Sequence, residues 1–136
     1  RRGELVTSIF VPFPLPKTGI SYQKFALREA NALAVASVAS RLTLKKGKIE
    51  RAAIVLGAVA PIPMLALRAS RFLSGKKPSD SLFEKAALMA KEEGKPISDM
   101  RGSMWFRKEL IDVLTRRALS EALRRAQGKR EEEIEP

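Results

Sequence analysis

Residues 33–60 read LAVASVASRLTLKKGKIERAAIVLGAVA, and this stretch decides the fold. It holds two apolar runs, 33–44 and 49–60, on either side of the basic turn KKGK at 45–48. Because the glycine of this turn can take a positive φ, the two runs are predicted to pair as an antiparallel hairpin. Neither run alternates clearly between polar and apolar residues, which indicates strands that are covered on both faces at the centre of a sheet.

Two more strands are predicted ahead of this hairpin. Residues 20–28 alternate as a half-polar strand does, with Lys24 and Arg28 on the same side. These two cations could meet an anion or a flavin, or they could be solvated charges at a sheet edge. Residues 4–11 (ELVTSIFV) are rich in β-branched and aromatic residues and stop at Pro12, so we expect an edge strand there.

The second half of the chain follows a helical period. We expect a helix over 64–73 that ends before Gly75, and a second helix from Ser81, with a capping box to Glu84, up to Gly94. A third helix should start at Ser98 or Ser103 and run to residue 126. Strands followed by helices indicate an α+β fold, with a small antiparallel sheet of three to four strands packed against about three helices.

The third helix should bury one stripe, and the chain should form one domain. The stripe contains Ile111, Leu114, Ala118 and Ala122 at helical spacing. Three apolar residues lie off this stripe and are expected at the surface: Trp105, Leu119 and Leu123. We expect the domain over 1–127 and a charged, disordered tail over 128–136.

The composition excludes many kinds of active site. The 136 residues contain no cysteine and no histidine, so disulfides, thiolate or imidazole metal sites and imidazole-based triads are excluded. Only three aspartates are present, and we expect neither a catalytic residue nor a resident metal in this chain. The longest apolar run is too short and too often interrupted to span a bilayer, and with no cysteine the cytoplasm is the expected compartment.

The charge balance raises a second class of function. Lysine and arginine total 26 against 15 acidic residues, a net charge of +11. Clustered cations bind nucleic acid by releasing counterions, and they also steer the docking of acidic proteins. Here the cations are spread over every segment, and one Trp and one Tyr offer no stacking platform for single strands. A free-standing basic module for nucleic acid or complex scaffolding stays open as the alternative.

Three ordered motifs carry a resemblance to a known family. They are YQKFALREANALAV at 22–35, AIVLGAVAPIP at 53–63, and SDMRGS at 98–103 followed by FR at 106–107. In this order and spacing they resemble the C-terminal domain of the FAD-binding medium subunit of molybdenum hydroxylases. That family includes aerobic carbon monoxide dehydrogenase and xanthine dehydrogenase. The resemblance runs from residue 3 to about residue 126 and covers nearly the whole chain.

The resemblance implies a place beside a flavin. It implies that this chain is the second half of a subunit whose first half binds the adenine and pyrophosphate of FAD, and that this upstream FAD-binding domain is absent from the chain. It places four residues near the isoalloxazine ring as cofactor-binding candidates: Lys24, Arg28, Asn31 and Leu33. Many relatives carry an acidic residue where this chain has Asn31 and Ala32. A role that needs a carboxylate in this turn is therefore not carried over.

The resemblance also implies partners. Electrons would pass from a molybdenum cofactor on a large subunit, through iron–sulfur clusters on a small subunit, to FAD held in part by this domain. The isolated chain should then be inactive, and it could self-associate through surfaces that are normally covered. A split gene, with this domain joining a separately encoded FAD domain, is a further possibility. Asp99 and Arg101 are expected to cap and tether the third helix, without a chemical role.

Overall fold

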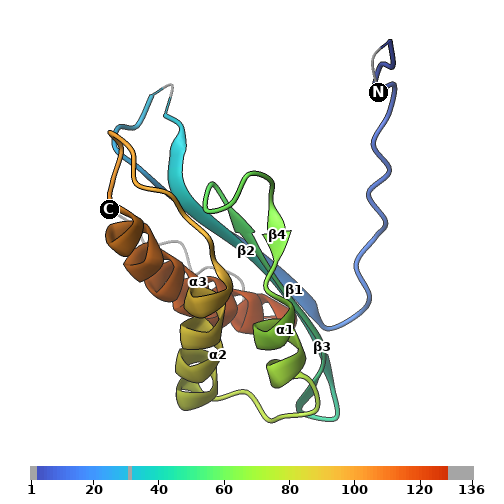
Figure 1. Ribbon diagram of the computed structural model, residues 1–136. Coiled ribbons are helices and arrows are strands. Elements are labelled where there is room, and N and C mark those ends of the chain that lie inside the picture. The colour runs from blue at the N-terminus through green and yellow to red at the C-terminus, as the bar shows by residue number, and fades with distance from the viewer. Residues whose placement is uncertain (1–2, 31, 129–136) are drawn as a thin grey trace, which may run out of the picture.

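A computed structural model describes residues 3–30 and 32–128 as a four-stranded antiparallel sheet backed by three helices (Figure 1). The strands follow one another in the sheet in the order β1-β2-β3-β4. The elements are β1 (Thr18–Ala26), β2 (Ala34–Lys45), β3 (Lys48–Gly57), β4 (Met64–Leu65), α1 (Leu67–Leu73), α2 (Asp80–Glu93) and α3 (Met104–Ala126). The predicted α+β class is confirmed. Apart from Gly128, the expected tail over 128–136 lies outside the described residues.

The central hairpin forms as the sequence predicts. Lys45 pairs with Lys48, and the two residues between them both have positive φ, 50° at Lys46 and 73° at Gly47. This is the backbone twist that a two-residue hairpin turn requires. Strands β2 and β3 occupy the centre of the sheet, as predicted.

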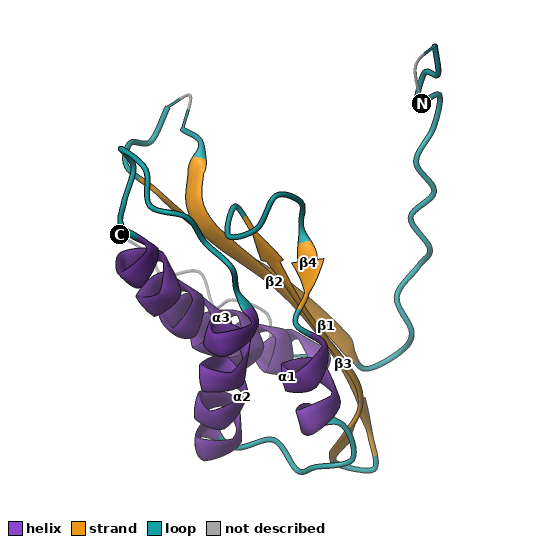
Figure 2. Cartoon of the chain, in the orientation of Figure 1, coloured by secondary structure: helices purple, strands orange, loops and turns teal. Residues whose placement is uncertain are grey.

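All three helices cover the same face of the sheet (Figure 2). Helix α3 packs on β1 and β2, α1 packs on β3, and α2 packs against both helices. Their apolar side chains meet inward-facing residues of β2 and β3 in one core, which includes Val38, Leu42, Ile54, Leu56, Phe83 and Ile111. Leu119 was expected at the surface but is fully buried. The expectation was wrong because α3 packs against both the sheet and α2, which widens its buried stripe.

Helix α3 comes closest to the sheet at Gly19 of β1. A Cβ atom at this position would lie 1.8 Å from the carbonyl oxygen of Ala122 and 2.5 Å from the backbone nitrogen of Ala126. The helix presents only small side chains here, so the two backbones are in direct contact. Gly19 is therefore required for space.

The opposite face of the sheet carries no described helix, and we call it the open face. Tyr22, Ala39, Val55 and Leu65 lie in one row across the four strands. Tyr22 is 60% exposed and Leu65 is 47% exposed. The sequence predicted that both faces of β2 and β3 would be covered. That interpretation was wrong for most of this face, because small, half-buried residues such as Ala39 and Ala53 account for the weak polar alternation.

The predicted edge strand over residues 4–11 is absent from the described structure. The segment runs away from the domain as an extended trace, shown in blue in Figure 1. A strand needs a neighbouring strand to pair its backbone groups, and no described strand lies beside this segment. The prediction was wrong because β-propensity alone supplies no partner.

Two helix starts also differ from the sequence-based expectation. Helix α1 begins at Leu67, because Met64 and the next residue pair with β3 as a short strand. The N-cap of α2 is Ser79 and not Ser81, since the Ser79 hydroxyl accepts a hydrogen bond from the Leu82 backbone nitrogen at 3.2 Å. Helix α3 starts after the cap Ser103, one of the two predicted positions.

Replacing Gly19 by alanine should destabilise the domain by at least about 2 kcal/mol, because the new methyl group meets backbone that cannot move aside cheaply. The urea midpoint of the chain measures this loss. Gly47→Ala is the matched control, because a Cβ there meets nothing within 4 Å and only the positive φ is strained. Its cost should be about 1 kcal/mol. Equal losses for the two variants would contradict the close approach of α3.

Candidate functional site

Three connections meet at one end of the sheet, which we call the loop end. They are the β1–β2 connection (27–33), the β3–β4 connection (58–63) and the α2–α3 connection (94–103). Arg107 of α3 donates to the carbonyl of Ala58, and a Cβ on Gly102 would lie 3.6 Å from Val35. The loop end is therefore built from segments that are distant in the sequence.

The structure brings three of the four predicted flavin-proximal residues to the loop end. Lys24 is exposed on the open face in the same row as Ser37 and Gly57. Leu33 is 72% exposed and immediately precedes the start of β2. Arg28 lies in the β1–β2 connection, and Asn31 lies outside the described residues.

The prediction that Lys24 and Arg28 share one face of a strand was wrong. Strand β1 ends at Ala26, two residues before Arg28. A β-bulge ends the pairing, because Phe25 pairs with Ala36 while Ala26 pairs with Ala34. Bulges break the alternation on which the sequence argument depended.

Helix α3 begins beside this bulge. The ring of Phe25 packs edge-on against the ring of Phe106, with 5.7 Å between the ring centroids. Such edge-to-face packing is favourable for aromatic pairs. The end of β1, and with it Lys24, is held in place by the first turn of α3.

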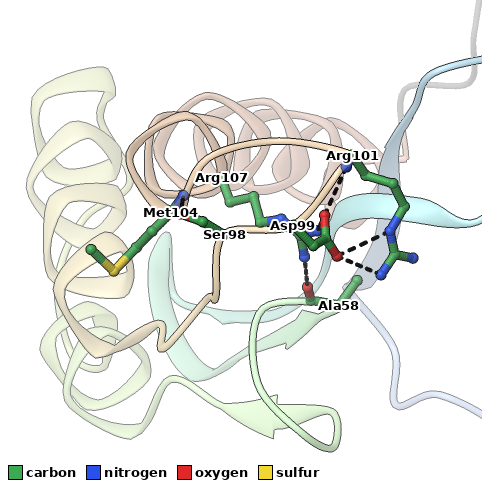
Figure 3. A network of polar contacts seen from close by, with 6 residues as sticks. All are labelled: Ala58, Ser98, Asp99, Arg101, Met104 and Arg107. Atoms are coloured by element: carbon green, nitrogen blue, oxygen red, sulfur yellow. Dashed lines mark hydrogen bonds and ion pairs between the residues drawn. The ribbon is translucent and has the colours of Figure 1, made fainter.

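A buried arginine holds the loop end together (Figure 3). Arg107 is 3% exposed, and its guanidinium donates to an oxygen of the Asp99 carboxylate and to the carbonyl of Ala58 at 3.1 Å. The second carboxylate oxygen of Asp99 accepts from the Arg101 guanidinium at 2.8 and 3.2 Å. A buried guanidinium needs a counter-charge and hydrogen-bond acceptors. The two terminal nitrogens of Arg107 have them, while its buried Nε has no partner among the described residues. The network fixes the α2–α3 connection against the β3–β4 connection.

The tether role predicted for Asp99 and Arg101 is confirmed, whereas the cap role is wrong. Two serines satisfy the start of α3 instead. The Ser103 hydroxyl accepts from the Phe106 nitrogen at 3.1 Å, and the Ser98 hydroxyl accepts from the Met104 nitrogen at 2.8 Å.

The Asp99 carboxylate is committed to its charged form. Hydrogen bonds from the Arg101 side chain, then from the Arg101 backbone nitrogen, then from the Arg107 side chain hold the pKa of Asp99 well below its ordinary value of 3.8. A carboxylate with so low a pKa cannot act as a proton donor or acceptor near neutral pH. The network is structural.

A pocket of about 420 Å³ opens beside this network. Its lining residues are Ala58, Ala60, Pro61, Lys95, Ile97, Asp99, Arg101 and Arg107. Three cations against one carboxylate give the lining an excess of positive charge. A larger pocket of about 710 Å³ lies at the opposite end of the sheet, beside the Lys46-Gly47 turn and the end of α3, away from every predicted site residue.

Two kinds of feature are not found in the described part of the chain. Residues 3–30 and 32–128 contain no cluster of three or more His, Cys, Asp or Glu that could hold a metal. No helix in these ranges is long and apolar enough to cross a membrane. The described residues of the loop end can present a cation and an apolar surface to a ligand or partner.

From the sequence, Arg107 was identified only as part of the FR motif, and its role as a buried cation that joins two loops was not predicted. The signal was its position four residues before Ile111, on the apolar stripe of α3. An arginine on a buried stripe indicates a paired, buried cation. The acceptor carbonyl of Ala58 could not be found this way, because it lies 49 residues away.

The domain is an open antiparallel sheet with helices on one face and an exposed lysine near its loop end. The chain belongs to the family of carbon monoxide dehydrogenase flavoprotein C-terminal domains. The sequence model of this family matches residues 21–122. The recognised family is confirmed, and the match covers the whole sheet except the start of β1, together with all three helices except the end of α3.

Curated relatives are similar over most of this chain. It is 38% identical over 120 residues, 88% of the chain, to the glyceraldehyde dehydrogenase medium chain of Sulfolobus acidocaldarius. It is 35% identical over 126 residues, 93% of the chain, to the carbon monoxide dehydrogenase medium chain of Afipia carboxidovorans. The chain spans only 42% and 43% of these two relatives.

Solved structures share the fold. The chain matches a carbon monoxide dehydrogenase from Oligotropha carboxidovorans with a TM-score of 0.78 and 33% identity, over 85% of the chain and 40% of the matched chain. It matches quinoline 2-oxidoreductase from Pseudomonas putida with a TM-score of 0.74 and 34% identity, over 85% of the chain and 39% of the matched chain. The similarity therefore covers the part of those proteins that corresponds to one domain.

Replacing Asp99 by asparagine should lower the melting temperature by roughly 5 °C or more, because the buried Arg107 loses its counter-charge. Arg101→Gln is the matched control, since the Arg101 side chain is 39% exposed and Arg107 keeps its partner. The control should shift the melting temperature by no more than about 2 °C. A larger loss for Arg101→Gln would show that the exposed pair, and not the buried one, holds the loop end.

The contribution of Asp99 to stability should also depend on pH. Because its folded-state pKa is depressed, the stabilisation is fully present above the unfolded pKa near 4 and is lost as the pH falls toward the folded pKa. The stability difference between the wild-type chain and Asp99→Asn should be constant from pH 5 to 7 and shrink below pH 4. Urea titrations across this range measure the difference. A difference that stays constant down to pH 2.5 would contradict the assignment.

Proposed function

We propose that this chain is the C-terminal part of the FAD-containing medium subunit of a molybdenum hydroxylase, where it helps to hold the flavin. The observation that carries the proposal is the family match over most of the domain, together with relatives named as medium chains and FAD-binding subunits. The chain spans less than half of those relatives, so the remaining part of the subunit would hold the rest of FAD.

The residues of the open face fit the isoalloxazine end of FAD. Lys24 is an exposed cation, and no ion pair to it is found in the described part of the chain. Beside it lies a flat surface of small and apolar residues, with Ala39 and Val55 in the neighbouring row and exposed Leu33 at its end. A planar conjugated ring suits such a surface. Arg28 already takes part in another interaction, and we assign the main role to Lys24 and Leu33.

Lys24 would act electrostatically. Bound FAD would supply the electron-accepting chemistry, and its reduced form carries more negative charge than its oxidised form. A fixed ammonium group near the ring stabilises that charge and raises the reduction potential. Asp99 and Arg107 would act only by holding the loop end rigid.

The partners follow from the same proposal. A large subunit would hold the molybdenum cofactor and oxidise the substrate, and a small subunit would carry the iron–sulfur clusters that deliver electrons to FAD. The complex would work in the cytoplasm. By itself this chain would catalyse nothing. The basic-module alternative gains no support from the relatives, so we do not pursue it.

Purification of the complete medium subunit tests the proposal. We expect it to carry about one FAD per chain and to copurify with a large molybdenum subunit and a small iron–sulfur subunit when the three are produced together. A complete subunit that binds no flavin under these conditions, while its domains are folded, would refute the assignment.

In the assembled enzyme, Lys24→Met should make the flavin reduction potential more negative by about 20 mV or more, which corresponds to roughly 1 kcal/mol for a two-electron couple. Lys24→Arg keeps the charge and should restore most of the potential. Lys48→Met, at the opposite end of the sheet, is the control and should leave the potential unchanged. Spectroelectrochemical titration measures all three, and an unchanged potential in Lys24→Met would remove the assigned role.

A further inference from the structure

The segment over residues 4–11, which we call the N-terminal segment, exposes an unusual amount of apolar surface. Leu5, Phe10 and Val11 are 90%, 89% and 80% exposed, and Val6 and Ile9 are also above 80%. No backbone hydrogen bond joins residues 5–11 to any other described part of the chain. A contiguous apolar stretch that is exposed to solvent indicates a surface that another protein or another domain covers.

The residue pattern of this segment is that of a strand and not of a linker. Its β-branched and aromatic residues favour extended backbone. In a strand, Leu5, Ile9 and Val11 would point to one side, and Val6 and Phe10 to the other. Because both sides are apolar, the segment would need cover on both faces, as a strand in a layered sheet has.

The chain between this segment and the sheet keeps the two apart. Pro12, Pro14 and Pro16 favour an extended polyproline conformation, which would span about 19 Å over residues 12–17. Lys17 then turns the chain into β1 with a φ of 56°. The N-terminal segment therefore cannot fold back easily beside β1, and Figure 1 shows it leaving the domain.

We propose that residues 4–11 form a β-strand by adding to a sheet edge in the FAD-binding part of the medium subunit. This inference rests on the proposed function. The family description is that of a C-terminal domain and the relatives are more than twice as long, so under the proposed function the rest of the subunit would precede this segment in the sequence. Strand addition would pair the backbone groups of residues 5–11 and bury their apolar side chains.

The missing N–H of Pro12 would end this strand, because proline cannot donate to a sheet ladder. The strand would fix one end of the proline-rich spacer to the FAD-binding part and leave the other end at β1. The open face and its Lys24 would thereby be held at a set distance from the flavin-holding part. A second copy of this chain is the less suitable partner, since a bare two-stranded pairing would leave one apolar face in water.

Hydrogen exchange tests the inference on the complete FAD-loaded medium subunit and on the 136-residue chain. We expect the amides of residues 5–11 to exchange at least about 100-fold more slowly in the complete subunit than in the 136-residue chain, where they should be unprotected. Val38, in the centre of the sheet, should be protected in both and serves as the internal control.

Two variants of the complete subunit sharpen the test. Ile9→Asp should abolish the protection of residues 5–11, because it places a charge on a covered face. Phe13→Asp, equally exposed but beyond Pro12, should leave that protection intact. Loss of protection in both variants alike would show nonspecific unfolding of the segment and contradict a strand that ends at Pro12.

Other outcomes separate this inference from the proposed function. Unprotected amides at 5–11 in a subunit that holds FAD would overturn the strand and leave the function standing. If the amides of residues 5–11 were protected in the 136-residue chain, and more so at higher protein concentration, the segment would pair with a second copy of the chain. That result would also overturn the proposed strand addition. Protection in a complete subunit that holds no FAD would support the strand and refute the proposed function.

Discussion

Helix α3 is fixed at both ends, and the arrangement of the domain depends on this. Near its C-terminal end the helix backbone touches β1 at Gly19, where no side chain fits between them. Near its start the buried Arg107 binds the Asp99 carboxylate and the Ala58 carbonyl. One contact sets the distance between helix and sheet, and the other sets the positions of two loops. Both are needed for a rigid loop end.

The proposed function depends on the division of the sheet into a covered and an open face. The helices supply the hydrophobic core on one face and stabilise the sheet. The other face is then free to meet a cofactor or another domain with little reorganisation. Lys24 projects from this face, and the bulge after Phe25 ends the strand just beyond it. Under the proposed function, the domain would tune a cofactor through charge and shape.

Local rules predicted much of this fold. The KKGK turn, the two apolar runs around it and the stripe of α3 were enough to place the central hairpin and the longest helix, because each depends on residues close in sequence. The family motifs added four candidates for flavin-proximal residues. Lys24 and Leu33 both lie near the loop end, and their contact with a flavin stays a prediction.

Features that depend on contacts between residues distant in the sequence were not predicted. Glu93 of α2 accepts hydrogen bonds from the backbone nitrogens of Arg68 and Ala69, and so caps a helix that has no side-chain cap of its own. The bulge that removes Arg28 from β1 depends on the pairing with β2. The strand expected over residues 4–11 has no neighbouring strand in the part of the chain that the structure describes. In each case the sequence shows which kind of contact one residue or segment can make, but it does not show which distant residue lies beside it.

Lysine labelling of the complete medium subunit, with and without FAD, tests the central claim that the open face lies against the flavin. The account predicts that Lys24 is acetylated readily in the FAD-free subunit and at least about tenfold more slowly once FAD is bound, whereas Lys48 at the far end reacts equally in both states. Equal reactivity of Lys24 in the two states, in a subunit shown to hold FAD, would contradict it.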